Sequence, residues 1–210
     1  MSNWIIYSIG FIAQLLFSAR LLVQWLQSEK HKRIITPSIF WKLSLMGSIL
    51  LFIYGYYRQD FAIMFGQTLT YFIYIRNLQL QGEWRLFKGW IRLITIIFPL
   101  VLAGYIFVYG DYTVDALFNE KLIPRWLVWL GITSQLLFTL RFVYQWMYSE
   151  QRKTSHLPLG FWIMSFVGAT LILIYAFYRK DPVLIFAHGF GLIIYARNIL
   201  LSRDTNSGVS

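Results

Sequence analysis

Two stretches of this sequence, 121 residues apart, are diverged copies of each other. Adding 121 to a residue number between 10 and 80 reaches an identical residue at about 28 of the 71 positions, without a gap. Identity of that density indicates that one structural unit occurs twice. The chain must therefore adopt a fold that a unit of this size can form in duplicate.

The repeated unit consists mainly of apolar runs separated by short polar joints. The chain has 210 residues, of which 58% are hydrophobic and 13% charged, which is too apolar for an ordinary soluble domain and typical of a polytopic membrane protein. We predict seven helices, at residues 4–27, 38–57, 61–80, 91–109, 126–148, 159–178 and 182–201. Each repeat then holds three of them, and the run that begins at Ile91 has no counterpart in either repeat.

This unmatched fourth helix determines the predicted architecture. Three membrane helices in series end on the opposite side from where they began, so two such units would be antiparallel unless one further helix separated them. The sequence therefore predicts an all-α, polytopic membrane protein of seven transmembrane helices in a 3+1+3 arrangement, with a pseudo-two-fold axis along the membrane normal. We expect the first three-helix repeat at 1–82, a linker at 83–124, the second repeat at 125–202 and a disordered tail at 203–210.

The charges predict how the chain is oriented. Basic residues follow the first and fifth predicted helices, whereas the longest opposite loop is acidic; the groups are Lys30, Lys32, Arg33, Arg152 and Lys153 against Asp111, Asp115 and Glu120. An excess of Lys and Arg marks cytoplasmic loops, so we expect the N-terminus outside and the C-terminus in the cytoplasm. The same asymmetry accounts for the net charge of +10 without a nucleic-acid partner. The first apolar run has no small-residue cleavage pattern and is expected to remain as a helix.

Matched polar residues fall on shared helix faces. At 100° per residue, Arg20, Gln24, Ser28 and Gln14 lie within an arc of about 120°, and their counterparts in the second repeat do likewise. A second stripe on the third helix includes Tyr74 and Asn77, with Tyr195 and Asn198 as counterparts. We predict a substrate site between the repeats. Its candidate residues are Arg20, Gln24, Asn77, Tyr74, Gln14, Arg141, Gln145, Asn198, Tyr195, Gln135, Trp41, Trp162, Glu29 and Glu150.

Arg20 and Arg141 are the most informative members of this set. Intramembrane charges mark sites or pathways, and guanidinium binds phosphate with bidentate geometry, so the pair suggests a site for an anionic lipid. The structural alternative is an internal salt bridge with Glu29, Glu150 or an Asp. Arg76 and Arg197 point away from the tyrosine stripe, and we expect them to pair with a neighbouring carboxylate or to snorkel toward phospholipid.

Other residues permit two interpretations each. The tryptophans Trp41 and Trp162 are either anchors at the membrane interface or surfaces on which a sugar stacks. His188 is either a hydrogen-bonded neutral side chain or a metal ligand or proton carrier. The sequence has no cysteine, no zinc-ligand spacing and no Gly-rich phosphate loop, so we predict no metal, no cofactor and no enzymatic activity.

The repeated residues also resemble those of a known family. The segments "FSARLLVQWLQSE", "PSIFWKLSLMGSILLFIYGYYRQD" and "YIRNLQL", together with their counterparts "FTLRFVYQWMYSE", "PLGFWIMSFVGATLILIYAFYRKDP" and "YARNILL", resemble the lipid A biosynthesis N-terminal-like (LAB_N) membrane domain family. The resemblance covers about two-thirds of the chain. It implies a place in the bacterial inner membrane and a role beside enzymes that glycosylate lipid A or other envelope polymers. Disaccharide synthase activity is not expected, because the catalytic part of that enzyme is absent from this sequence.

Three functions are compatible with these observations. The preferred hypothesis is a flippase that moves a lipid-linked sugar, such as a polyprenyl-phosphate monosaccharide, from the inner to the outer leaflet. The 3+1+3 layout is similar to that of the SWEET sugar transporters, which suggests a facilitator for a small soluble sugar as an alternative. The third possibility is a non-catalytic membrane partner of a glycosyltransferase.

Overall fold

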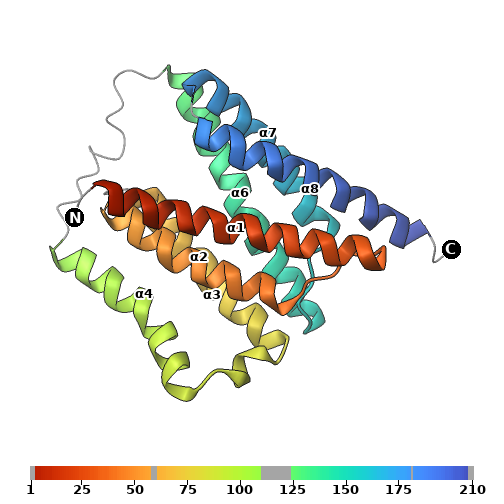
Figure 1. Ribbon diagram of the computed structural model, residues 1–210, viewed down its shortest axis with the longest axis horizontal. Coiled ribbons are helices and arrows are strands. Elements are labelled where there is room, and N and C mark those ends of the chain that lie inside the picture. The colour runs from red at the N-terminus through yellow and green to blue at the C-terminus, as the bar shows by residue number, and fades with distance from the viewer. Residues whose placement is uncertain (1–2, 58–60, 110–123, 181, 208–210) are drawn as a thin grey trace.

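The structure, a computed structural model, describes residues 3–57, 61–109, 124–180 and 182–207. This part of the chain contains no strand, so the all-α prediction is confirmed for it. Figure 1 shows the helices in space. They are α1 (Asn3–His31), α2 (Ser38–Tyr57), α3 (Phe61–Leu80), the short 3-10 helix η1 (Glu83–Leu86), α4 (Gly89–Tyr109), α6 (Arg125–Arg152), α7 (Leu159–Arg179) and α8 (Pro182–Ser207). The predicted acidic outer loop, with Asp111, Asp115 and Glu120, lies outside the described residues.

The predicted starts of the helices agree with the structure to within two residues, whereas some ends differ. Helices α1 and α6 end at His31 and Arg152, about one turn beyond the predicted residues 27 and 148. The polar residues in this last turn predict a helix end that is too early. Polarity shows where the apolar environment ends, and not where the backbone hydrogen bonds of the helix end. The actual stops are Lys32 and Lys153, whose φ of 53° is left-handed. Helix α8 likewise continues to Ser207, into the predicted tail.

Within each repeat the helices pack in chain order, α1 on α2 and α2 on α3, then α6 on α7 and α7 on α8. Glycines allow the close approaches. A Cβ on Gly10 would lie 2.8 Å from the Tyr54 ring, and one on Gly47 would lie 3.0 Å from the Phe17 ring. The packing therefore brings the aromatic ring of one helix onto the bare backbone of the next. We call α1–α3 the first unit and α6–α8 the second unit.

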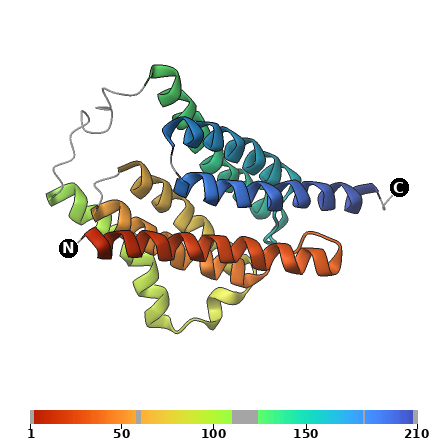
Figure 2. The same ribbon diagram turned by 45° about the horizontal axis from the view of Figure 1, so that its top comes forward.

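The two units meet through α1 against α8 and α3 against α6. Figures 1 and 2 show α1 and α8 running in the same direction. The main buried cluster draws on both units, because Trp41 and Tyr74 of the first unit lie in it with Phe142, Trp162 and Tyr195 of the second. The core of the molecule therefore includes the contact between the units.

Helix α4 lies at the margin of the first unit (Figures 1 and 2). The Tyr71 hydroxyl of α3 donates to the Thr95 carbonyl of α4 at 2.7 Å. Before it, Glu83 of η1 accepts a hydrogen bond from Lys42 of α2 at 2.6 Å, and this contact holds the pKa of the Glu83 carboxyl below its usual value. The connection after α3 is thereby fixed to the first unit.

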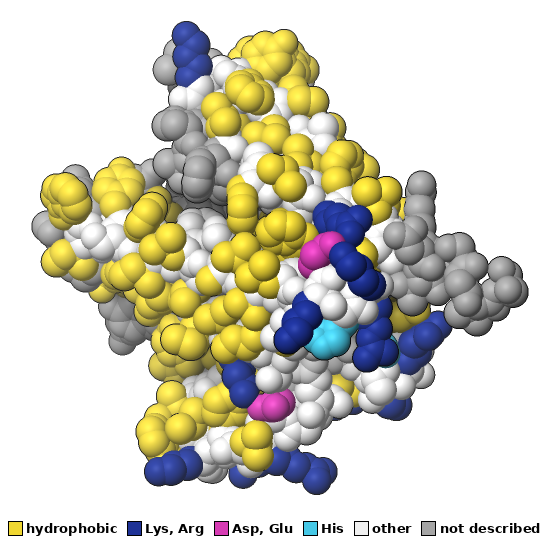
Figure 3. Space-filling model, turned by 45° about the vertical axis from the view of Figure 1, so that its right-hand side comes forward, with side chains coloured by type: hydrophobic (Ala, Val, Ile, Leu, Met, Phe, Trp, Pro, Cys, Tyr) yellow, Lys and Arg dark blue, Asp and Glu magenta, His cyan; other side chains and the backbone are white. Residues whose placement is uncertain are grey.

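Four of the described helices are long and apolar enough to cross a membrane. These segments are Trp4–His31, Ser38–Tyr57, Arg125–Arg152 and Leu159–Tyr178. Much of the surface is hydrophobic, and Figure 3 shows basic side chains gathered on one part of it, together with glutamate and histidine. The basic residues at the C-terminal ends of α1 and α6 and just beyond them, among them Lys30, Lys32, Arg152 and Lys153, are exposed. The surface thus combines an apolar body with a charged end.

Candidate functional site

Ser28 and its counterpart Ser149 fasten the loop that follows their helix. The Ser28 hydroxyl accepts from the backbone N–H of Ile35 at 2.9 Å, and the Ser149 hydroxyl accepts from the N–H of His156 at 3.0 Å. Each hydroxyl also accepts from the side-chain amide one turn earlier, Gln24 at 2.9 Å or Gln145 at 2.8 Å. The matched Gln and Ser therefore shape the loop as well as the helix face.

The same glutamines join the two units. Gln24 of α1 and Asn198 of α8 exchange amide hydrogen bonds, at 2.9 Å and 3.2 Å. Gln145 of α6 and Asn77 of α3 do the same, at 2.8 Å and 3.1 Å. All four side chains are fully buried. Each pair couples one unit to the other, as a two-fold relation between the units requires, and the amides use their hydrogen-bonding capacity on each other and on nearby backbone.

Two ion pairs repeat this exchange at the helix ends. Arg197 of α8 binds Glu29 of α1 with two hydrogen bonds of 2.8 Å, and Arg76 of α3 binds Glu150 of α6 with two of 2.7 Å. The prediction that Arg76 and Arg197 pair with a carboxylate is confirmed. Because Glu29 and Glu150 are engaged in this way, the structure does not show a salt bridge between either of these carboxylates and Arg20 or Arg141. The aspartate side chains, which the structural alternative also included, lie outside the described part of the structure.

Arg20 and Arg141 lie instead among aromatic rings. Arg20 is 5% exposed and Arg141 is 2% exposed. Arg20 donates to the Ser44 hydroxyl at 2.7 Å and to the Tyr74 hydroxyl at 3.3 Å, whereas Arg141 donates to the Tyr195 hydroxyl at 3.4 Å. Phenylalanines complete both environments, Phe17 and Phe40 around Arg20 and Phe138 and Phe161 around Arg141.

Neither guanidinium has an ion-pair partner among the described carboxylates, and no described atom accepts a hydrogen bond from the Nε of Arg20 or Arg141. A buried cation normally has an anionic partner, because removing it from water costs several kcal/mol. Aromatic faces compensate in part, at about 0.5–2 kcal/mol for each contact. Within the described part of the chain, the pair therefore carries positive charge at the contact between the units that no carboxylate neutralises.

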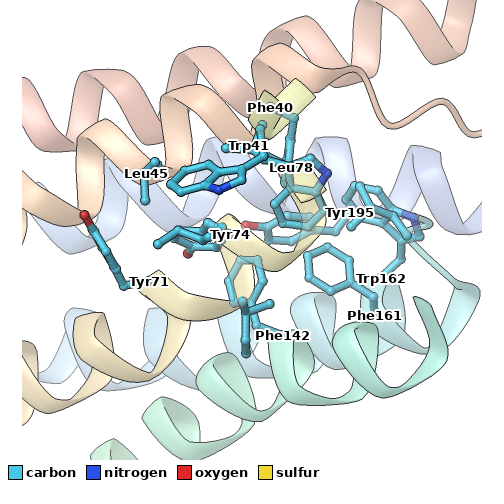
Figure 4. Close-up of a cluster of buried hydrophobic side chains, with 14 of the residues drawn as sticks. Phe40, Trp41, Leu45, Tyr71, Tyr74, Leu78, Phe142, Phe161, Trp162 and Tyr195 are labelled. Atoms are coloured by element: carbon cyan, nitrogen blue, oxygen red, sulfur yellow. The ribbon is translucent and has the colours of Figure 1, made fainter. Parts of the chain in front are cut away.

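The symmetry between the units fails beside this pair. The Trp41 indole N–H donates to the Ser155 hydroxyl at 2.8 Å, and that hydroxyl donates to Asn77 at 2.7 Å. The counterpart Trp162 has no described acceptor for its indole N–H. The residue that corresponds to Ser155 in the first unit is Ile34, which has no hydroxyl. Figure 4 shows Trp41 and Trp162 within the cluster around Tyr74, Phe142 and Tyr195.

The structure brings together most of the predicted site residues, but in different roles. Trp41 and Trp162 are fully buried in the core, and the interfacial-anchor and sugar-stacking interpretations both require an accessible ring. Gln14 is exposed and lies apart from the buried set, while the side chain of its counterpart, Gln135, is outside the described part of the structure. His188 packs against Phe138 with ring centroids 5.1 Å apart. Among the described residues, no group of three or more His, Cys, Asp or Glu could hold a metal ion.

Sequence reasoning missed the aromatic environment of the arginines and the hydroxyl of Ser155. Phe17 and Phe138 were detectable, since they are identical at the 121-residue spacing and lie one turn before the arginines. Phe142 and Ser155 carried no such signal, because Leu21 and Ile34 occupy the corresponding positions. A search for identical residues at the 121-residue spacing cannot find residues that differ between the two units.

The fold and the site together define an apolar helical protein in which two copies of a unit are joined by matched polar pairs around two buried arginines. The model of the Lipid A Biosynthesis N-terminal domain matches the chain twice, at residues 9–79 and 130–200, and the chain belongs to this family. The suspected resemblance is therefore confirmed. No solved structure matches the chain, so the likeness to SWEET transporters stays a prediction.

Relatives of known name match almost the whole chain. The chain is 33% identical over 206 residues to a protein of Chlamydia caviae, 29% over 202 residues to one of Chlamydia pneumoniae and 31% over 206 residues to one of Chlamydia felis. Each is named lipid-A-disaccharide synthase. The alignments cover 93%, 94% and 94% of this chain but 33% of each relative, so the chain spans about one third of their length.

These names correct one prediction. We expected no enzymatic activity, and the relatives that match this chain over most of its length are named as an enzyme. The prediction was drawn from missing catalytic motifs, and motif searches cannot detect that a helical segment belongs to a larger catalytic protein. The chain corresponds to the N-terminal part of proteins with an enzyme's name.

Proposed function

We propose that this chain is a membrane-spanning module of lipid A biosynthesis that binds the phosphate-bearing head group of a lipid-linked sugar between its two units. One observation carries the proposal: Arg20 and Arg141 are buried at the contact between the units, without a carboxylate partner among the described residues. The family and the relatives' name support a role in lipid A biosynthesis, and the four apolar helices support a membrane-spanning location.

Phosphate is the ligand that suits this pair best. Guanidinium presents parallel N–H donors that match two phosphate oxygens, and such charge-assisted bonds contribute about 1.5–3 kcal/mol each. A neutral sugar has no use for two buried cations. A lipid-borne phosphate would supply a counter-charge, and its acyl or prenyl chain would remain in the bilayer.

The exposed basic loops orient the module in this proposal. Lys30, Lys32, Arg152 and Lys153 lie at the C-terminal ends of α1 and α6 or one residue beyond them, next to the glutamates that form the ion pairs between the units. By the rule that basic loops face the cytoplasm, this end lies on the inner side of the bacterial inner membrane, with the N-terminus outside and the C-terminus inside. Arg20 and Arg141 then lie on the cytoplasmic side of the bilayer middle.

Two uses of such a site are open to test. In the first, the units rock about their shared contact and move the lipid-linked sugar from the inner to the outer leaflet; the duplicated units support this use. In the second, the site presents its lipid to a disaccharide synthase, which the name of the Chlamydia relatives supports. The same bound phosphate serves both.

Binding is tested with the full chain in lipid nanodiscs that contain a fluorescent polyprenyl-phosphate sugar. The double variant Arg20→Met/Arg141→Met should lose at least tenfold in affinity, since each arginine contributes charge-assisted bonds. The matched control is Arg76→Met/Arg197→Met, which removes equal charge from arginines that already have carboxylate partners. Equal affinity of the first variant and the wild type would refute the proposal.

Reconstituted vesicles then separate the two uses. A leaflet-specific quencher measures movement of the labelled lipid, and added lipid-A-disaccharide synthase measures delivery. Movement that depends on Arg20 and Arg141 would support the flippase, whereas stimulated synthesis without movement would support presentation to the enzyme.

A further inference from the structure

One aromatic ring contacts both buried arginines. The Cζ of Arg20 lies 5.3 Å from the ring centroid of Phe142, and the Cζ of Arg141 lies 4.8 Å from it. Phe142 is 3% exposed and packs edge-on against Tyr74 and Phe161, each with ring centroids 5.3 Å apart. Two cations thus share the electron-rich π system of one ring at the contact between the units. Figure 4 shows Phe142 in the buried cluster with Tyr74 and Phe161.

Phe142 breaks the symmetry of the site. Its counterpart in the first unit is Leu21, which is half-buried and packs against the same core. A leucine has no π face and cannot interact with a guanidinium in this way. The second unit alone therefore supplies the ring that the two arginines share.

The shared ring affects the electrostatic cost of burying the two arginines. Two buried like charges repel, and the repulsion is strong where water is excluded. An aromatic ring that contacts both cations attracts both, because the faces of the ring carry negative electrostatic potential. Phe142 thereby attracts both arginines as an anion would, but more weakly.

We propose that Phe142 is a gate residue that occupies the anion position between Arg20 and Arg141 and withdraws when a phosphate bridges them. The inference rests on the proposed function, since it assumes that the arginines bind the phosphate of a lipid head group. Phe142 then sets the affinity, because every phosphate that enters must displace the ring and its two cation–π contacts.

The first experiment measures binding to the full chain in detergent micelles by calorimetry. The probes are inorganic phosphate and dihexanoyl phosphatidic acid, which separate a free anion from a lipid head group, with dihexanoylglycerol as the uncharged control. Phe142→Leu introduces the residue that the first unit carries at this position, and Leu21→Phe is the matched reverse change. Phe142→Leu should bind the phosphatidic acid about tenfold more tightly than the wild type, since it removes the competing contacts, and Leu21→Phe should bring no gain.

The outcomes distinguish this inference from the proposed function. If Arg20→Met/Arg141→Met binds the phosphatidic acid as the wild type does, the anion site itself is wrong. If binding depends on the arginines but Phe142→Leu leaves the affinity unchanged or weaker, the gate is wrong and the anion site stands. An equal gain from Leu21→Phe would also overturn the gate, since it would show a general effect of changed packing.

A second measurement needs no ligand. Double-mutant cycles between Phe142→Leu and either Arg20→Met or Arg141→Met compare the folding equilibria in micelles. A shared ring predicts that Phe142 couples to each arginine, by about threefold to thirtyfold in the equilibrium constant. Coupling to neither arginine, or to one alone, would refute the arrangement from which the gate is inferred.

Discussion

Replacing Ser155 by alanine should destabilise the contact between the units by about 2 kcal/mol. The Ser155 hydroxyl accepts from the Trp41 indole N–H and donates to the Asn77 side chain. Without it the buried indole N–H has no acceptor, a loss of about 1–3 kcal/mol. Asn77 loses less, about 0.5 kcal/mol, because its oxygen still accepts from Gln145 at 2.8 Å.

The chain offers its own matched control for this reasoning. Trp41 and Trp162 occupy equivalent positions and both are fully buried, but only Trp41 has a described acceptor for its N–H. Trp41→Phe should therefore cost about 1–2 kcal/mol more than Trp162→Phe, which removes an N–H that already lacks a described partner. The loss of ring area is the same in both variants.

The assay is equilibrium unfolding of the full chain in mixed micelles, followed by circular dichroism. In a double-mutant cycle, Trp41→Phe and Ser155→Ala should couple by about 1–1.5 kcal/mol, since each removes the same hydrogen bond. Equal costs for Trp41→Phe and Trp162→Phe, or a coupling near zero, would refute the reasoning.

Three further predictions concern helix packing, a helix end and an ion pair. Gly47→Ala should lower stability by about 1 kcal/mol in the same unfolding assay, because its Cβ would meet the Phe17 ring at 3.0 Å and overpacking outweighs the gain in helix propensity; a stabilised variant would contradict the packing described. Lys180→Gly should raise stability by about 0.5–1 kcal/mol, since φ at this residue is 52° and glycine adopts that conformation without strain; no change would show that the backbone there is unstrained. Glu150→Gln should lower the thermal midpoint by a few degrees, because it removes the negative charge that pairs with Arg76 and Lys153, and the difference from the wild type should shrink as salt rises; a difference independent of salt would contradict an electrostatic origin.

Much of the fold was predictable because the apolar runs and the repeat are strong local signals. The run from residue 61 to 80 predicted α3 exactly where it occurs, and helical geometry separated Arg76 from Tyr74 before any contact was known. A carboxylate partner for Arg76 was then one of two expectations, from the cost of an unpaired charge, and the structure shows that this partner is Glu150. Such inferences need only the angle of a residue on its own helix.

The partners of the polar residues could not be predicted in this way. Helical angles place Gln24 and Asn77 on faces, but they do not say which helix each face meets, and both residues pair with the opposite unit instead of lining an open site. Ser155 and Phe142 were missed for a second reason, since the repeat directs attention to identical positions and these two differ from Ile34 and Leu21. A local sequence pattern shows neither which helices pair in the fold nor where the two repeats have diverged.

The reciprocal amide pairs have a consequence for how such a chain could have arisen. Each unit carries both partners of these contacts: a glutamine and an asparagine for the amide pairs, and a glutamate and an arginine for the ion pairs. A free-standing ancestor of one unit would therefore be self-complementary and could close as a symmetric homodimer. In a homodimer, every substitution occurs in both subunits. Fusion of two genes removes this restriction, because each unit can then change separately. A tandem protein can keep a phenylalanine or a serine in one unit alone, as Phe142 and Ser155 are kept here.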